Sequence, residues 1–247
     1  SHAVIAAIRA EINVKKANLS VPKNYKDSDK VEAYLVGKAA ELDNSFADEY
    51  RKTSLDGARG QICVIGLAID EDAPRAFFRD DWQDPEAERG ILHDFFTTVS
   101  EEFQRRRSFS IPHFIGHNII DFDLLFIFQR AVVLGIKPPD GIPFDARPWD
   151  PSVFDTCTKW AGVGNRVSLD KLCKALAIAG KGSEIGEDID GSQVWDYVQR
   201  GEIAKVAEYC KGDVERTRAI FKRLTFAPVL PPSIPDSQNN SAMPDSL

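Results

Sequence analysis

The residues of this chain that could do chemistry lie in two short segments about 85 residues apart. In the first, an apolar stretch typical of a short buried strand precedes Asp121 and Asp123, which we expect in the first turn of a helix. In the second, Tyr209 and Asp213 are four residues apart, so on a helix both side chains project from one face. Because magnesium prefers hard oxygen ligands, these carboxylates predict a site for a divalent cation.

The same residue types fit phosphodiester hydrolysis by a metal-dependent nuclease. Two cations about 3.5–4 Å apart can activate a water molecule, stabilise the pentavalent phosphorus and neutralise the leaving alkoxide. We expect Asp123 and Asp213 to hold two such cations, Mg²⁺ or Mn²⁺. The pKa of a free tyrosine is about 10, so the hydroxyl of Tyr209 is expected to orient the attacking water rather than to take its proton.

Three residues shortly before Asp123 could hold the end of the substrate. Asn118 offers both a donor and an acceptor. Phe122 offers an apolar face on which a base can stack whatever its sequence. His117 could also meet the substrate, although a histidine beside a glycine turn is as often a hydrogen-bonding spacer.

These residues carry a resemblance to a known family. Asn118-x-x-x-Phe122-Asp123 resembles the second, and Tyr209-x-x-x-Asp213 the third, sequence motif of the DnaQ-like 3′-5′ exonucleases of the tyrosine (DEDDy) type. The wider context, GHNIIDFDLLFIFQRA, VFDT, SLDKLCKALAI and EYCKGDVERTRAIF, resembles the stand-alone bacterial group related to the proofreading domain of family-B DNA polymerases. The resemblance implies a ribonuclease H-like fold and the release of nucleoside monophosphates from the 3′ end of single-stranded DNA, with RNA as the alternative substrate.

The first motif of that family, Asp-x-Glu on an apolar strand, has no counterpart in the sequence. In the family this strand lies in the middle of the sheet, so its removal would leave unpaired edges on both sides. The only methionine is Met243. We therefore expect the strand to be encoded upstream of Ser1, and we expect the printed chain to bind metal poorly and to degrade nothing.

Each candidate also has a purely structural interpretation. Asn118 or Asp121 could cap the helix that follows. Tyr209 could be a core residue with its hydroxyl at the surface, and Asp213 could pair with Arg216 on the same helix. The non-catalytic alternative is a nucleic-acid-binding or scaffold protein that keeps the fold.

Composition narrows the class of protein. The formal net charge of the 247 residues is −7, so any nucleic-acid contact must be local. The four cysteines are far apart, without a zinc-site spacing, and indicate a reducing compartment, so we expect a cytoplasmic protein. No apolar run reaches the roughly 18 residues of a membrane span.

The order of predicted elements indicates an α/β protein with a mixed sheet flanked by helices. We expect a helical arm or insertion over residues 1–60, a ribonuclease H-like domain over 61–225 and a disordered, proline-rich tail over 226–247. Within the domain the predicted strands are 61–69, 75–78, 111–116 and 153–154, and the predicted helices are 84–107, 121–134, 168–178 and 203–224, with Asp155 as a helix N-cap.

Overall fold

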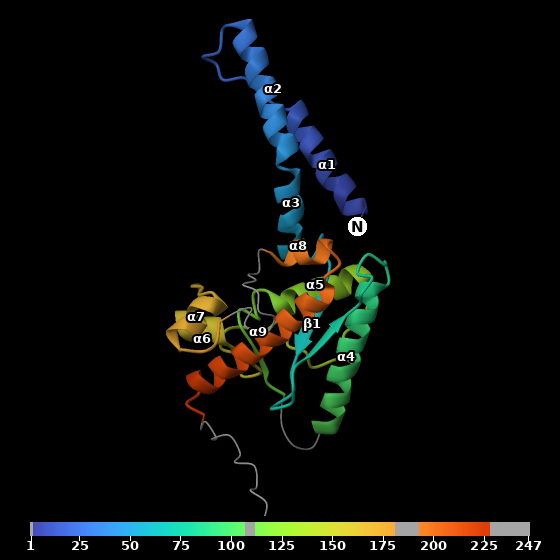
Figure 1. Ribbon diagram of the computed structural model, residues 1–247, viewed down its shortest axis with the longest axis vertical. Helices are drawn as coiled ribbons and strands as arrows, with labels where there is room; N and C mark the ends of the chain where they lie inside the picture. The colour runs from blue at the N-terminus through green and yellow to red at the C-terminus, as the bar shows by residue number, and fades with distance from the viewer. Residues whose placement is uncertain (1, 107–111, 181–192, 228–247) are drawn as a thin grey trace, which may run out of the picture.

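The computed structural model describes residues 2–106, 112–180 and 193–227, and for residues 2 and 3 it describes the backbone alone. It is a mixed α/β structure, which confirms the predicted class (Figure 1). In chain order the elements are α1 His2–Ala17, α2 Ser28–Asn44, α3 Phe46–Lys52, a 3₁₀ turn Thr53–Leu55, β1 Val64–Leu67, β2 Arg75–Phe78, α4 Ala87–Arg106, β3 Phe114–Gly116, α5 Asp123–Leu134, β4 Val153–Asp155, α6 Thr156–Ala161, α7 Leu169–Ala175, α8 Val194–Gln199 and α9 Ile203–Leu224. Most of the predicted tail lies outside the described residues.

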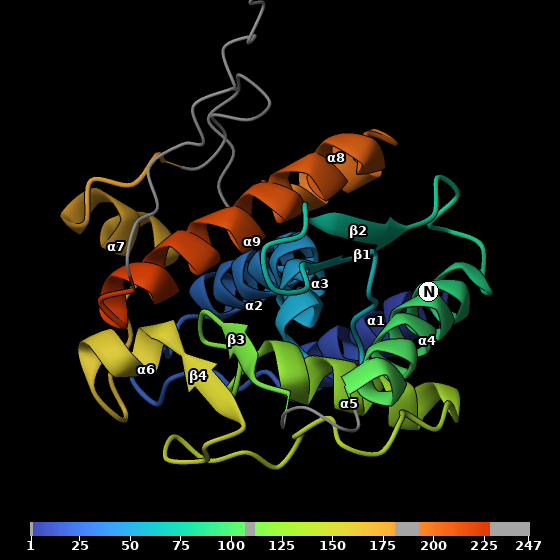
Figure 2. The same ribbon diagram turned by 90° about the horizontal axis from the view of Figure 1, so that it is seen from below.

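The strands form two small sheets rather than one. β1 and β2 are antiparallel, with Val64 opposite Phe78, and β3 and β4 are parallel, with Phe114 opposite Val153 (Figure 2). No strand in the described part of the chain joins β1 to β3. The strand expected over residues 61–69 is therefore too long. Among the described residues β1 pairs only with β2, and that pairing covers the four residues Val64–Leu67.

Helix α9 contacts strands of both sheets and so holds the two halves together. The helix packs tightly on Gly66 of β1, where a Cβ atom would lie 2.8 Å from the Sγ atom of Cys210. A side chain at that position would force the side chain of Cys210 to shift. The fit at Gly66 therefore fixes how the one-turn segment from Tyr209 to Asp213 sits over the strands.

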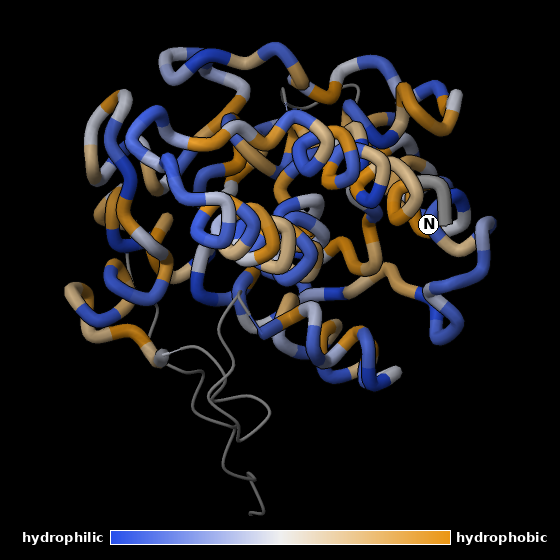
Figure 3. Tube along the Cα trace, turned by 90° about the horizontal axis from the view of Figure 1, so that it is seen from above, coloured by the Kyte–Doolittle hydropathy of each residue, from blue (hydrophilic) through white to orange (hydrophobic). Residues whose placement is uncertain are grey.

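The main core lies between the sheets and the helices α4 and α5. Ile91 and Leu92 of α4 are fully buried there, each contributing roughly 1.5–3 kcal/mol of hydrophobic stabilisation. Along the tube in Figure 3 hydrophilic and hydrophobic residues alternate within the helices, as expected of helices with one apolar face. The buried members of this core are Ile62, Ile65, Ile91, Leu92, Phe95, Phe96, Val99, Leu124, Ala131, Ile142, Ala146 and Val153.

A buried ion pair ties α4, α5 and the segment before β1 together. Both carboxylate oxygens of Glu88 accept hydrogen bonds from the guanidinium of Arg130, at 2.8 Å each. Glu88 also accepts from the backbone N–H of Ile62, and Arg130 donates to the carbonyl of Gly57. Every charge in this pair is therefore met by hydrogen bonds, as a buried charge requires.

The predicted helical arm is present as α1, α2 and α3, which project from the body (Figure 1). Its base docks on α8, a short helix that the sequence pattern did not predict. Tyr50 of α3 lies edge-on to Trp195 of α8, which in turn contacts Trp82, and Arg51 pairs with Asp196 at 2.7 Å. None of the described helices is long and apolar enough to span a bilayer.

Candidate active site

The turn between β3 and α5 carries the first set of candidate residues. Asn118 adopts a left-handed backbone conformation, with φ of 61°, which asparagine tolerates better than most residues. Its carbonyl accepts a hydrogen bond from the N–H of Phe122, at 3.0 Å. A Cβ atom on Gly116 would lie 2.4 Å from the Cβ atom of Ile119, which is too close for two carbon atoms. The turn can therefore bring Ile119 over residue 116 only because that residue is glycine. The result places Asp123 as the first residue of α5.

The capping interpretation of this turn is wrong for Asn118 and Asp121, since α5 has no side-chain cap. The turn is held instead by Asp155, at the end of β4, whose buried carboxylate accepts from the N–H groups of Asn118 at 2.9 Å and Ile120 at 3.3 Å. As predicted, Asp155 also caps the next helix, α6, through two backbone N–H groups. The sequence did not reveal its contact with the turn.

Residue Asp123 is accessible to water, although many protein atoms lie around its carboxyl group. Loss of hydration raises the pKa of its carboxyl group to about 7, against a smaller opposing effect of its own backbone N–H. The negative charges of Asp155 and Asp213 raise the pKa further. The structure thus brings Asp213 of α9 close enough for its charge to act on the carboxyl group of Asp123 at the start of α5.

On α9, Tyr209 is buried and Asp213 follows one turn later with its side chain 28% exposed. The carboxylate of Asp213 accepts from Arg216 at 3.1 and 3.3 Å, which is the ion pair that the structural interpretation of this residue anticipated. Arg216 is itself buried and also donates to the carbonyl of Gly180. The pair fixes the direction of the Asp213 side chain while leaving it partly accessible.

The other predicted substrate contacts have protein neighbours of their own. In His117, Nε2 lies 2.9 Å from the carbonyl oxygen of Val167, to which it donates, and Nδ1 lies 2.9 Å from Oγ1 of Thr156. These contacts favour the spacer interpretation of His117, since both ring nitrogens join the turn to α6 and to the loop before α7. The half-buried ring of Phe122 rests against Phe126, with ring centroids 5.6 Å apart.

The carboxylates of Asp123 and Asp213 can supply part, but not all, of the coordination of a divalent cation. Two carboxylates lie near each other, and the raised pKa of Asp123 indicates that its negative charge lacks a compensating positive charge. In the described ranges, however, no group of three or more His, Cys, Asp or Glu side chains is placed to hold a metal ion. Water molecules or further carboxylates must complete the coordination of a cation bound here.

Comparison with known proteins gives a family but no individual relative. Residues 61–228 match the model of a family described as a predicted 3′-5′ exonuclease related to the exonuclease domain of PolB. No curated protein matches the chain. No solved structure matches it either. Because the match spans more than half of the 247 residues, the chain belongs to this family of predicted 3′-5′ exonucleases related to the exonuclease domain of PolB.

Proposed function

We propose that the protein is a two-metal 3′-5′ exonuclease that hydrolyses single-stranded DNA from its 3′ end. The observation that carries the proposal is the carboxyl group of Asp123, whose pKa is raised to about 7 by burial and by the nearby charges of Asp155 and Asp213. Two carboxylates that repel each other and face solvent are suited to binding a divalent cation. Membership of the exonuclease family supplies the reaction class.

In this proposal each residue has one role. Asp123 and Asp213 hold the divalent cations, Mg²⁺ or Mn²⁺, which when bound supply the acidity that makes water nucleophilic at neutral pH. Tyr209, one turn before Asp213, orients the attacking water. Asn118 and Phe122 hold the terminal nucleotide.

His117 was expected from its sequence position to contact the substrate or to act as a spacer. Its bonds to Thr156 and Val167 support the second role, so we propose it as a positioning residue for the turn that carries Asn118. A further proposal concerns the printed chain, since its described residues offer Asp123 and Asp213 but no group of three or more metal ligands. We propose that it binds divalent cations weakly and degrades nothing.

The shortage of ligands among the described residues also supports a second candidate, a nucleic-acid-binding or scaffold protein without catalysis. No described residue distinguishes DNA from RNA, so an exoribonuclease remains the alternative within the same chemistry. The cytoplasmic location expected from the four cysteines also stays a prediction.

A nuclease assay on a short single-stranded oligonucleotide separates these candidates. The proteins are the product of the whole reading frame, its Asp123→Asn and Asp213→Asn variants, and the printed chain. With Mg²⁺ or Mn²⁺ we expect a 5′-labelled strand to shorten stepwise with release of mononucleotides, and we expect each variant to lose at least about 100-fold in rate. No degradation by the unsubstituted product would support the non-catalytic candidate, and an unchanged rate in both variants would contradict the roles of Asp123 and Asp213. A printed chain as fast as the whole product would contradict the proposal about its missing ligands.

A further inference from the structure

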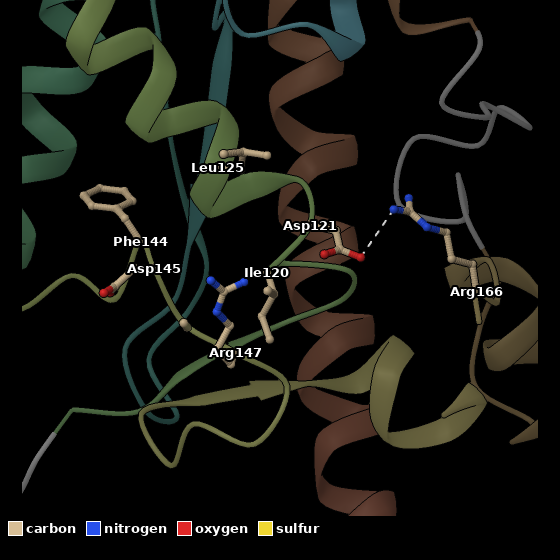
Figure 4. Close-up of a pocket in the computed structure, with 8 residues that line it drawn as sticks. Ile120, Asp121, Leu125, Phe144, Asp145, Arg147 and Arg166 are labelled. Carbon is tan, nitrogen blue, oxygen red and sulfur yellow. Dashed lines mark hydrogen bonds and ion pairs between the residues drawn. The ribbon is translucent and has the colours of Figure 1, made fainter. Parts of the chain in front are cut away.

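An open groove lies beside the turn that carries Asp123. Its volume is about 490 Å³, and its walls come from three parts of the chain (Figure 4). Ile120, Asp121 and Leu125 come from the turn and the first turn of α5, so they flank Asp123 in the sequence on both sides. The other walls are the loop before β4 and the loop after α6.

One wall of the groove is apolar and accessible. Leu125 is 42% exposed, which is high for a leucine next to a folded core. Phe144 lies near it and contacts Phe128, also 42% exposed, with ring centroids 5.4 Å apart. Such a surface can take the apolar face of a sugar or a base without reading its identity.

The groove also contains two arginines in different situations. The side chain of Arg147 makes no ion pair or hydrogen bond with any residue that the structure describes, and Figure 4 shows its guanidinium group directed toward Ile120 and Leu125. Arg166 lies on the far side of Asp121 and pairs with it at 3.3 Å. The side chains of that pair are 66% and 62% exposed, so the pair is weak and can exchange partners.

We propose that this groove binds the phosphodiester backbone of the single DNA strand whose 3′ end reaches Asp123. The inference rests on the proposed function and adds the path of the strand. Arg147 binds one phosphate, because a guanidinium group matches two phosphate oxygens at once. Arg166 binds a neighbouring phosphate after leaving Asp121, and the wall at Leu125 and Phe144 receives the sugar or base. The groove also contains the carboxylates of Asp121 and Asp145, so binding of the anionic ligand depends on Arg147, whose side chain has no partner among the described residues, and on the release of Arg166 from Asp121.

Binding of a fluorescently labelled oligothymidylate, followed by anisotropy in EDTA, tests the groove without any need for catalysis. For Arg147→Ala we expect the Kd to rise about tenfold. We also expect the dependence of log K on log salt to become shallower by about 0.7, as for the loss of one phosphate contact on a single strand. The matched control is Arg75→Ala, which removes an exposed arginine of β2, in the other sheet, and should change the Kd less than twofold.

A second variant tests the ion pair between Asp121 and Arg166, and its expected effect is tighter rather than weaker binding of DNA. Asp121→Asn removes a negative charge from the groove and frees Arg166, so we expect binding two- to fivefold tighter. A protein that merely lost local structure would instead bind more weakly. Equal affinities for Arg147→Ala and Arg75→Ala, or weaker binding by Asp121→Asn, would overturn the groove proposal.

The outcome for the groove is distinguishable from that for the exonuclease. Stepwise degradation of DNA by the whole product, with no effect of Arg147→Ala on binding, would overturn the groove and leave the proposed function standing. Binding that depends on Arg147 in a whole product that degrades nothing would support the groove and overturn the proposed function.

Discussion

The carboxylate of Asp155 accepts a hydrogen bond from the backbone N–H of Asn118, 2.9 Å away, across 37 residues of chain. Through this contact the end of β4 holds the turn that delivers Asp123 to α5. The same carboxylate accepts from Ile120, Cys157 and Thr158, so one buried side chain fixes two helix entrances at once.

Asp155→Ala should therefore cost more than the loss of an ordinary helix cap. We expect the free energy of unfolding to fall by about 2–4 kcal/mol, because four buried or partly buried N–H groups lose their acceptor. Urea denaturation measures the loss. The control is Asp27→Ala, which removes the exposed N-cap of α2 and should cost about 1 kcal/mol. Equal costs for the two variants would show that the contacts to Asn118 and Ile120 contribute nothing.

The ion pair between Glu88 and Arg130 gives a second stability prediction. Glu88→Gln leaves the guanidinium of Arg130 buried without a compensating charge, so we expect a loss of roughly 3–5 kcal/mol in the free energy of unfolding. Glu86→Gln, two residues earlier, breaks only an exposed pair with Arg89 and should change stability by less than about 1 kcal/mol. Thermal unfolding of both variants measures the difference, and a small effect of Glu88→Gln would contradict the account of this pair.

Part of this structure could be predicted from the sequence because it follows from local periodicity. The apolar spacing in α4, α5 and α9 predicted those helices nearly to their ends, and Asp155 was identified as a helix cap. The two spaced motifs also predicted Asp123 and Asp213 as parts of one site, and in the structure the charge of Asp213 acts on Asp123, while their role as metal ligands stays a prediction.

The rest depends on contacts between distant parts of the chain. The six-residue helix α8 has too few residues to show a period, and it is held by the packing of Trp195 on Tyr50 and Trp82. Nothing in the sequence around Glu88 distinguishes it from an exposed acid near a helix start, and only its partner on α5 explains why it is buried. The split of the sheet reflects strand pairing, which no local pattern encodes.

The thiols beside the candidate site should be chemically inert in the folded protein. Burial raises the pKa of Cys63 to about 11 and that of Cys210, which also feels Asp213 and Asp123, to about 12. Since the thiolate is the reactive form, we expect iodoacetamide at pH 8 to modify both residues at least about 100 times more slowly than in the urea-unfolded chain. Mass spectrometry of tryptic peptides measures the two rates. Rapid labelling of Cys210 in the folded state would contradict its position between α9 and β1.

The raised pKa of Asp123 predicts how stability depends on pH. The pKa is about 7 in the folded, metal-free protein and 3.8 ordinarily, so between these values the folded state binds more protons than the unfolded state. Stability should therefore fall as pH rises through this window. Asp123→Asn removes the penalty. At pH 8 we expect it to stabilise the metal-free protein by about 1 kcal/mol, less than the full shift implies because water reaches the carboxyl group.

The same variant should have almost no effect at pH 4, where Asp123 is protonated in the folded state, and Asp121→Asn serves as the exposed neighbour that should be neutral for stability at both pH values. Urea titrations in EDTA measure all three proteins. Mn²⁺ at a concentration well above its Kd should then reverse the order at pH 8, since a cation that binds the folded state stabilises only the protein that keeps Asp123. Stabilisation of Asp123→Asn by Mn²⁺ to the same extent as the unsubstituted chain would mean that this carboxylate does not hold the cation.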